Sequence, residues 1–270
     1  MKMEEVEFSS DKLVLRGELY LPELTHAPAI LVCHAMHGGG FRWLPLYRIF
    51  ARRAAERGFA CMLFDFRGCG ESEGQFDYGR GEQGDAKAAL EFLLSRRQVD
   101  TTSAFLVGRS LGGTVAIYSL VNDPRVKGYA LWATPPDHYQ NIKRYIEKMR
   151  GKLGYAIFLL LSIVDRVYEL RLDLFELKLR PKDVRGKLMT LSVARLITGK
   201  NHPPILFIIG DEDDYVSLPE EKSYENSITG TKRLVILPQT GHTFNEAEEQ
   251  VASVTLKWFE ELQSTTQHGV

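Results

Sequence analysis

The chain has 270 residues, of which 44% are hydrophobic and 26% charged, and its formal net charge is −1. These values are ordinary for a folded globular protein, and a chain this long can bury a large apolar core without disulfides or metals. They exclude a disordered chain, a fibrous repeat and a disulfide scaffold. Binding to nucleic acid requires a strongly basic face, so the near-neutral charge argues against nucleic acid as the main partner.

Cysteine usage and the N-terminal residues favour a cytoplasmic protein. The three cysteines, Cys33, Cys61 and Cys69, are odd in number and follow no metal-ligand spacing. The N-terminus has no apolar signal core. The longest apolar run, residues 153–164, is too short for a bilayer, which needs roughly 20 residues. We therefore expect a reduced, cytoplasmic chain without a membrane span; its oligomeric state is not indicated.

Short apolar segments alternate with helical patterns along most of the chain. Apolar runs bounded by turn residues predict strands, and apolar residues at helical spacing predict helices. In chain order, the expected strands are 6–8, 13–20, 29–33, 59–64, 104–107, 129–133, 205–209 and 234–237, and the expected helices are 44–56, 81–97, 111–121 and 245–262. This alternation predicts an α/β fold in which a mostly parallel sheet has helices on both faces.

Residues 135–202 interrupt the alternation. Helical patterns dominate there, no strand pattern is clear, and 14 Lys and Arg residues stand against 7 Asp and Glu residues. We interpret this segment as a helical cap insertion over the carboxyl edge of the sheet, with residues 1–134 and 203–270 forming the core domain. Three interpretations of its apolar run, 153–164, remain open: a helix that packs on the sheet, a pocket wall, or a surface that docks on a membrane.

The pattern G-x-S-x-G, which marks a serine nucleophile, occurs twice, at residues 108–112 and 70–74. A nucleophile elbow requires a strand that runs directly into a tight turn and then a helix. Ser110 has this context, whereas Ser72 leads into polar loop residues. We therefore predict Ser110 as the nucleophile and Ser72 as a loop residue. The alternative for Ser110 is a helix N-cap.

A serine hydroxyl needs a base, and the base needs an acid that orients it. His242 lies between the last strand and the last helix, at the sheet edge where Ser110 emerges. Four acidic residues, 211–214, follow the strand 205–209. The order Ser, Asp, His matches one of the known chain orders of such triads. The sequence thus predicts a Ser-His-Asp hydrolase.

These motifs, in this order, resemble the α/β-hydrolase superfamily of serine hydrolases from about residue 6 to 262, apart from the insertion. Members carry G-x-x-D-x-x-V at the acid turn, which Gly210, Asp213 and Val216 match, so the resemblance implies that Asp213 is the acid. Members also carry D-x-R-G-x-G-x-S, which residues 65–72 match as a structural loop. The nearest resemblance is to esterases and serine aminopeptidases, with cinnamoyl and feruloyl esterases as plausible relatives.

Acyl transfer also needs backbone N–H donors for the developing oxyanion. One is expected from Leu111, the residue after the nucleophile. In many relatives the second comes from His-Gly-x after the third strand, and here His34 and Ala35 precede Met36. The alternative donors are in the loop Gly38 to Gly40, which resembles an H-G-G-G motif. We favour Met36, because the strand ends near residue 33, and we expect His34 to brace the loop.

The predicted function is a serine carboxylesterase that hydrolyses small or medium acyl or aryl esters through an acyl-enzyme. Its substrate is a small-molecule ester, its expected pocket tyrosines are Tyr139, Tyr145 and Tyr155, and no metal or other cofactor is implied. An amide or peptide hydrolase and a thioesterase could use the same triad. A catalytically silent binding protein on this fold is the non-enzyme alternative, which a missing triad residue would favour.

Overall fold

The computed structural model describes residues 1–168, 170–174 and 176–267, and within them an eight-stranded sheet. The strand order is β1-β2-β4-β3-β5-β6-β9-β10. β1 and β2 are antiparallel to each other, β2 is antiparallel to β4, and all other neighbouring pairs are parallel. The strands are β1 (Lys2–Ser10), β2 (Leu13–Leu21), β3 (Ala27–Cys33), β4 (Ala60–Phe64), β5 (Val99–Arg109), β6 (Val126–Trp132), β9 (Ile205–Gly210) and β10 (Lys232–Leu237). The predicted mostly parallel sheet is confirmed.

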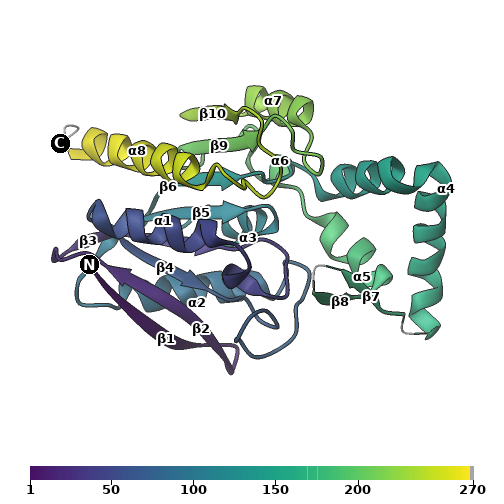
Figure 1. Cartoon of the computed structure of the whole chain (residues 1–270), viewed down its shortest axis with the longest axis horizontal. Helices are drawn as coiled ribbons and strands as arrows, with labels where there is room; N and C mark the ends of the chain where they lie inside the picture. Colours follow the sequence, from purple (N-terminus) through teal and green to yellow (C-terminus); the bar gives the residue numbers. More distant parts are fainter. Residues whose placement is uncertain (169, 175, 268–270) are drawn as a thin grey trace.

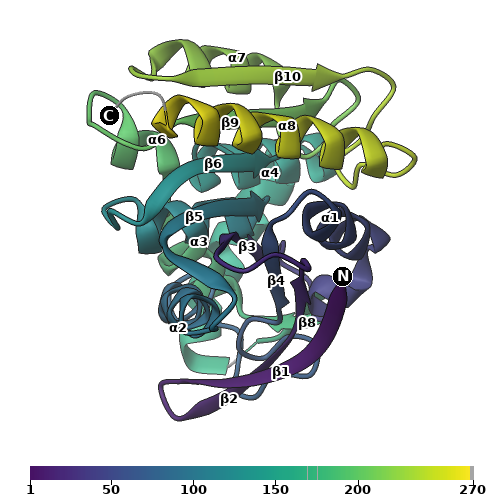
Figure 2. The ribbon, with the colours of Figure 1, turned by 90° about the vertical axis from the view of Figure 1, so that its left-hand side faces the viewer.

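Helices cover both faces of this sheet, as Figure 2 shows. Helices α1 (Pro45–Glu56) and α8 (Glu248–Gln267) lie on one face, and α2 (Glu82–Leu94) and α3 (Leu111–Leu120) lie on the other. The pleat of β3 divides its side chains between the two cores. Ile30 and Val32 join the core under α1 and α8, whereas Ala29 and Leu31 join the opposite core. Burial on both faces explains why this strand is a continuous apolar run.

The segment between β6 and β9 extends beyond one end of the sheet (Figure 1). It contains α4 (His138–Tyr168), β7 (Leu172–Leu174), β8 (Leu177–Leu179), α5 (Pro181–Gly186), the 3₁₀ turn η2 (Leu188–Thr190) and α6 (Val193–Ile197). The strands β7 and β8, which no pattern in the sequence indicated, pair antiparallel. Each strand has only three residues, which is too few for an alternating pattern to emerge from the sequence. The short 3₁₀ turn η1 (Gly40–Trp43) precedes α1, and α7 (Leu218–Ser227), also not predicted, connects β9 to β10.

The apolar run 153–164 lies in the second half of α4. One of its faces is exposed, which a helix packed on the sheet would not show. Leu153, Ile157 and Leu160 are 72%, 48% and 59% exposed. Tyr155 and Phe158 are buried on the opposite side of the helix. The run is apolar on nearly all sides, so the one face that packs inward leaves another apolar face uncovered.

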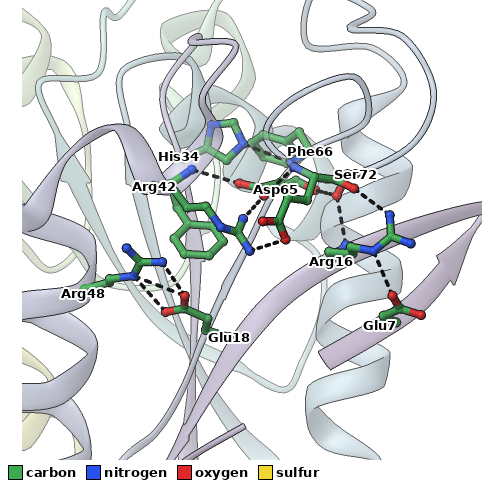
Figure 3. A network of polar contacts seen from close by, with 11 residues as sticks. Glu7, Arg16, Glu18, His34, Arg42, Arg48, Asp65, Phe66 and Ser72 are labelled. Carbon is green, nitrogen blue, oxygen red and sulfur yellow. Dashed lines mark hydrogen bonds and ion pairs between the residues drawn. The ribbon is translucent and has the colours of Figure 1, made fainter. Parts of the chain in front are cut away.

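The loop after β4 is organised by the buried carboxylate of Asp65 (Figure 3). This carboxylate accepts hydrogen bonds from the amides of Phe41 and Glu71, both at 3.1 Å, and pairs with the guanidinium of Arg42. Burial raises the pKa of Asp65 to about 6, and Arg42 opposes that rise. The Ser72 hydroxyl donates to the Asp65 carbonyl at 2.6 Å. Ser72 is therefore held in the loop, as predicted.

Two glycines allow β5, β3 and α3 to approach closely at Ser110. A Cβ added to Gly112 would lie 2.1 Å from the Cys33 carbonyl oxygen, and one added to Gly108 would lie 2.3 Å from the Gly113 Cα. We expect Gly112→Ala to lower the free energy of unfolding by about 3 kcal/mol, because backbone atoms must shift. Gly186→Ala is the matched control, since a Cβ there meets nothing within 4 Å. Urea unfolding of both variants measures the difference, and equal stabilities would contradict the prediction.

Candidate active site

Ser110 lies at the turn between β5 and α3, with φ 51° and ψ −121°. This backbone conformation is strained for a residue with a side chain, and such strain concentrates at functional sites. The Ser110 amide donates to the Trp132 carbonyl at 2.8 Å, which fixes the turn against β6. The sharp turn directs the side chain away from the strand that delivers it. The geometry is that of a nucleophile elbow.

His242 and Asp213 meet from two separate loops. Asp213 lies in the turn after β9, where its Oδ1 accepts the amides of Tyr215 at 2.9 Å and Val216 at 2.7 Å. Its Oδ2 lies 2.9 Å from His242 Nδ1. Nδ1 is thus the donor of the imidazole, and Nε2 remains the acceptor. Burial lowers the pKa of His242, and the hydrogen bond to Asp213 opposes that effect, so the ring is neutral at pH 7.

Ser110 and His242 line one cavity of about 210 Å³. In the part of the chain that the structure describes, no hydrogen bond joins the Ser110 hydroxyl to His242; catalytic hydrogen bonds often tighten only when substrate binds. Asp213 lies behind His242, with its side chain fully buried. The full lining is Ala35, Met36, His37, Trp43, Arg109, Ser110, Tyr145, Asp214, Tyr215, His242 and Thr243.

Only one of the three tyrosines expected in the pocket lines this cavity. Tyr145 does so, and its ring meets that of Tyr215 edge-on at 5.0 Å. Tyr139 and Tyr155 lie outside the cavity, and Tyr155 stacks on Phe158 instead. Tyr145 follows Tyr139 by six positions in the helix, a rotation of about 240°, which turns their side chains to different faces. Tyr155 follows the bend of α4 at Gly151, where φ is 68°.

The candidate backbone donors for the oxyanion differ in whether they already donate a hydrogen bond. Within the described residues, no hydrogen bond engages the amide of Met36 or that of Leu111. In the loop Gly38 to Gly40, two amides already donate hydrogen bonds. The Gly39 amide donates to His37 Nδ1 and the Gly40 amide to the His37 carbonyl, both at 3.0 Å. Met36 lines the cavity, whereas none of the three glycines does.

His34 has both ring nitrogens engaged behind this loop, and Figure 3 shows its contact with Phe66. Its Nδ1 donates to the Ala35 carbonyl at 2.6 Å, and its Nε2 accepts from the Phe66 amide at 3.0 Å. Burial lowers the pKa of His34 to about 4. A neutral ring with one donor and one acceptor fits this arrangement, so His34 braces the loop that carries Met36.

Arg109 is a cavity residue that the sequence patterns did not single out. Its side chain is buried, its Nη2 donates to the His242 carbonyl at 2.7 Å, and its guanidinium lies 5.6 Å from the Trp43 ring. Arg109 therefore holds the turn that carries His242. It occupies the variable position of G-x-S, which the pattern leaves undefined, and its place next to Ser110 was the available signal.

Within residues 1–168, 170–174 and 176–267, no three His, Cys, Asp or Glu side chains gather as metal ligands would. The cavity lining offers a hydroxyl on Ser110, an imidazole on His242 and a guanidinium on Arg109.

Comparison with known proteins assigns the family. A model of the alpha/beta hydrolase family matches residues 30–254. The chain belongs to this family. The resemblance inferred from the motifs is thereby confirmed, and so is the fold class.

Among curated relatives, the quorum-quenching protein AidA of Acinetobacter baumannii is 33% identical over 127 residues. That match covers 45% of this chain and 40% of AidA. A match to an uncharacterized protein of Rickettsia prowazekii covers 56% of that protein. The chain therefore spans about half the length of these two curated relatives. An uncharacterized 31.7 kDa protein of Escherichia coli is 25% identical over 267 residues, covering 86% of this chain and 90% of that protein.

Solved structures share the fold over nearly the whole chain. The complex of DcsB with its substrate analogue has a TM-score of 0.79 at 19% identity and covers 96% of this chain and 99% of DcsB. Est1E of Butyrivibrio proteoclasticus, solved with ferulic acid bound, has a TM-score of 0.75 at 17% identity and the same coverage. At these identities the likeness shows a common fold.

Proposed function

We propose that the chain is a serine esterase in which Ser110 attacks the ester carbonyl. One observation carries this proposal: Ser110, at a strained strand-to-helix turn, opens into the same cavity as His242, whose Nδ1 is bound by Asp213. This combination supplies a nucleophile, a base and an orienting acid. The structural likeness to Est1E, which was solved with ferulic acid, is in keeping with an ester substrate.

In the proposed reaction, His242 Nε2 takes the proton of the Ser110 hydroxyl as its Oγ bonds to the carbonyl carbon. The tetrahedral intermediate collapses, the ester C–O bond breaks, and His242 returns the proton to the leaving alcohol. Water then attacks the acyl-enzyme as His242 takes its proton. The bond between the acyl carbon and Ser110 Oγ breaks, His242 returns the proton to Oγ, and the acid is released. Asp213 stays ionised throughout; it fixes the tautomer of His242 and stabilises the imidazolium.

We further propose that the amides of Met36 and Leu111 form the oxyanion hole. Both lack a hydrogen-bond partner within the described residues, as donors kept for substrate would. The competing amides of Gly39 and Gly40 already bind His37. This difference supports Met36 over the glycine loop.

Residues 135–202 are proposed as a cap, with residues 1–134 and 203–270 as the hydrolase core. Tyr145 from α4 reaches the cavity, which is the contribution expected of a cap. The cavity of about 210 Å³ lies below the roughly 300–1,000 Å³ of drug-sized ligand sites. A short acyl or compact aryl ester therefore fits better than a long acyl chain.

Rates on aryl esters with acyl chains of different length test this substrate class. We expect kcat/KM to be greatest for short acyl groups and to fall steadily toward long ones, because the cavity is small. A hydroxycinnamate ester tests the aryl alternative. An optimum at the longest chains, with a jump in rate at the solubility limit, would contradict an enclosed pocket. Faster turnover of a matched amide or thioester would favour one of those hydrolase classes instead.

The pH dependence of ester hydrolysis follows from the environment of His242. A base acts when it is deprotonated, and burial lowers the pKa of His242, so its active form persists below the ordinary value of about 6.5. We expect kcat/KM to rise with pH through one group whose pKa lies below the ordinary histidine value. Initial rates in constant-ionic-strength buffers measure this. A rise centred above pH 7 would show that another group is the base.

A further inference from the structure

The second half of α4 exposes an apolar face. Leu153, Ile157, Leu160, Ile163 and Val167 are 72%, 48%, 59%, 56% and 75% exposed. Their spacing of three and four residues places them on one side of the helix. We call these five residues the α4 apolar face. An exposed apolar patch of contiguous side chains marks an interaction surface more often than a random surface feature.

The inward side of the same helix is the more polar one. Tyr155 and Phe158 pack inward beside Ser162 and Asp165, and all four are buried. The Asp165 carboxylate accepts hydrogen bonds from the Arg180 guanidinium at 3.2 Å and from the Lys182 amide at 3.1 Å. An amphipathic helix of an isolated globular protein has the opposite arrangement, with its polar side outward. The outward side of α4 is therefore built for an apolar environment.

The location of the α4 apolar face leaves it open to a large partner. Figure 1 shows the second half of α4 at the outer end of the molecule, on the side away from the sheet. At about 1.5 Å per residue, residues 152–168 form a rod roughly 25 Å long. In the described part of the chain, no helix is both long and apolar enough to cross a bilayer. A helix of this kind can lie in the plane of a membrane surface.

Charge identifies the kind of partner. Exposed basic residues lie at both ends of the apolar face: Lys148, Arg150 and Lys152 precede it, Arg166 lies beside its last residue, Val167, and Arg171 follows, close to the exposed Asp173. The only acidic residue between positions 150 and 168 is Asp165, which faces inward. Two copies joined through this face would bring basic ends together in either orientation. Anionic lipid headgroups, in contrast, complement both ends.

We propose that the α4 apolar face docks in the plane of a bilayer that contains anionic lipid. The five apolar side chains enter the boundary between headgroups and acyl chains, and the flanking basic residues contact the anionic headgroups. This docking is independent of the catalytic assignment, because it uses none of the residues proposed for the reaction.

Flotation with lipid vesicles tests the proposal, using phosphatidylcholine vesicles with and without phosphatidylglycerol. We expect the protein to float with the anionic vesicles, and to float less in high salt and with phosphatidylcholine alone. The double variant Leu153→Ser/Leu160→Ser should lower the partition coefficient by tenfold or more, because two large apolar side chains no longer enter the lipid. Leu24→Ser is the matched control, since Leu24 is 60% exposed outside α4, and it should bind like the parent.

A second variant separates docking from a folding defect. Lys148→Glu/Lys152→Glu leaves the apolar face intact and should weaken binding to anionic vesicles without changing the urea midpoint or the hydrolysis of a soluble ester. No flotation of the parent protein with anionic vesicles would overturn the proposal. A dimer in analytical ultracentrifugation that Leu153→Ser/Leu160→Ser dissociates, with no vesicle binding, would assign the face to a second copy. Loss of hydrolysis in Ser110→Ala with retained flotation is expected, since the two proposals are independent.

Discussion

Ser110→Ala should lower kcat for ester hydrolysis by a factor of about 10⁴ to 10⁶, because the attacking oxygen is removed while the cavity remains. The strained turn at Ser110 and the cavity it shares with His242 motivate this expectation. An organophosphonate probe should label the parent protein at Ser110 alone, as peptide mapping by mass spectrometry would show. The variant should not be labelled.

Ser72→Ala is the matched control, since Ser72 is the serine of the second G-x-S-x-G pattern. Its hydroxyl donates to the Asp65 carbonyl and accepts from the Arg16 amide, so it is committed to the loop. We expect this variant to keep its labelling and most of its activity, with some loss of stability. Labelling of Ser110→Ala, or a probe adduct on Ser72, would overturn the assignment of the nucleophile.

Asp213→Asn should lower kcat by a factor on the order of 10⁴, because an amide in place of the carboxylate favours the wrong tautomer of His242. Asp213 has one oxygen on His242 Nδ1 and the other on two backbone amides, so its orientation is fixed. Steady-state rates at pH 7, where His242 is neutral, measure the loss.

Asp211→Asn and Asp214→Asn are the controls in the same acidic run. Both side chains are exposed, and neither has a hydrogen bond to His242 within the described residues. Asp214 lines the cavity, so its variant should change KM more than kcat. If Asp211→Asn is instead the variant that loses most activity, the G-x-x-D-x-x-V alignment is wrong by two residues.

Predictions from local sequence patterns succeeded where the pattern itself has a physical cause. Every strand predicted for the main sheet is present. For inner strands such as β3 and β4 the physical cause is burial on both faces, which requires a continuous apolar run. The Ser110 elbow was also predictable, since Gly108 and Gly112 are required by backbone contacts that a Cβ would obstruct. The resemblance to the family selected Asp213 from four acidic neighbours, and in the structure it is Asp213 that bonds to His242.

The segment between β6 and β9 was the least predictable part. Its strands β7 and β8 are three residues each, below the length at which an alternating pattern is recognisable. Which tyrosine of α4 enters the cavity depends on helix phase and on the bend at Gly151, neither of which residue identity specifies. The role of Arg109 depends on the His242 turn, which lies more than a hundred residues away in the chain.

The sequence by itself thus determined the main-sheet strands in their order along the chain, the nucleophile turn and the chemical identity of the three candidate catalytic groups, because these depend on local backbone geometry and residue chemistry. Tertiary structure alone decided which side chains share the cavity and which face of α4 is left uncovered. An apolar run such as 153–164 has the same composition whether it is buried or exposed. Only the packing of Phe158 and Asp165 against the rest of the segment turns Leu153 and Leu160 outward.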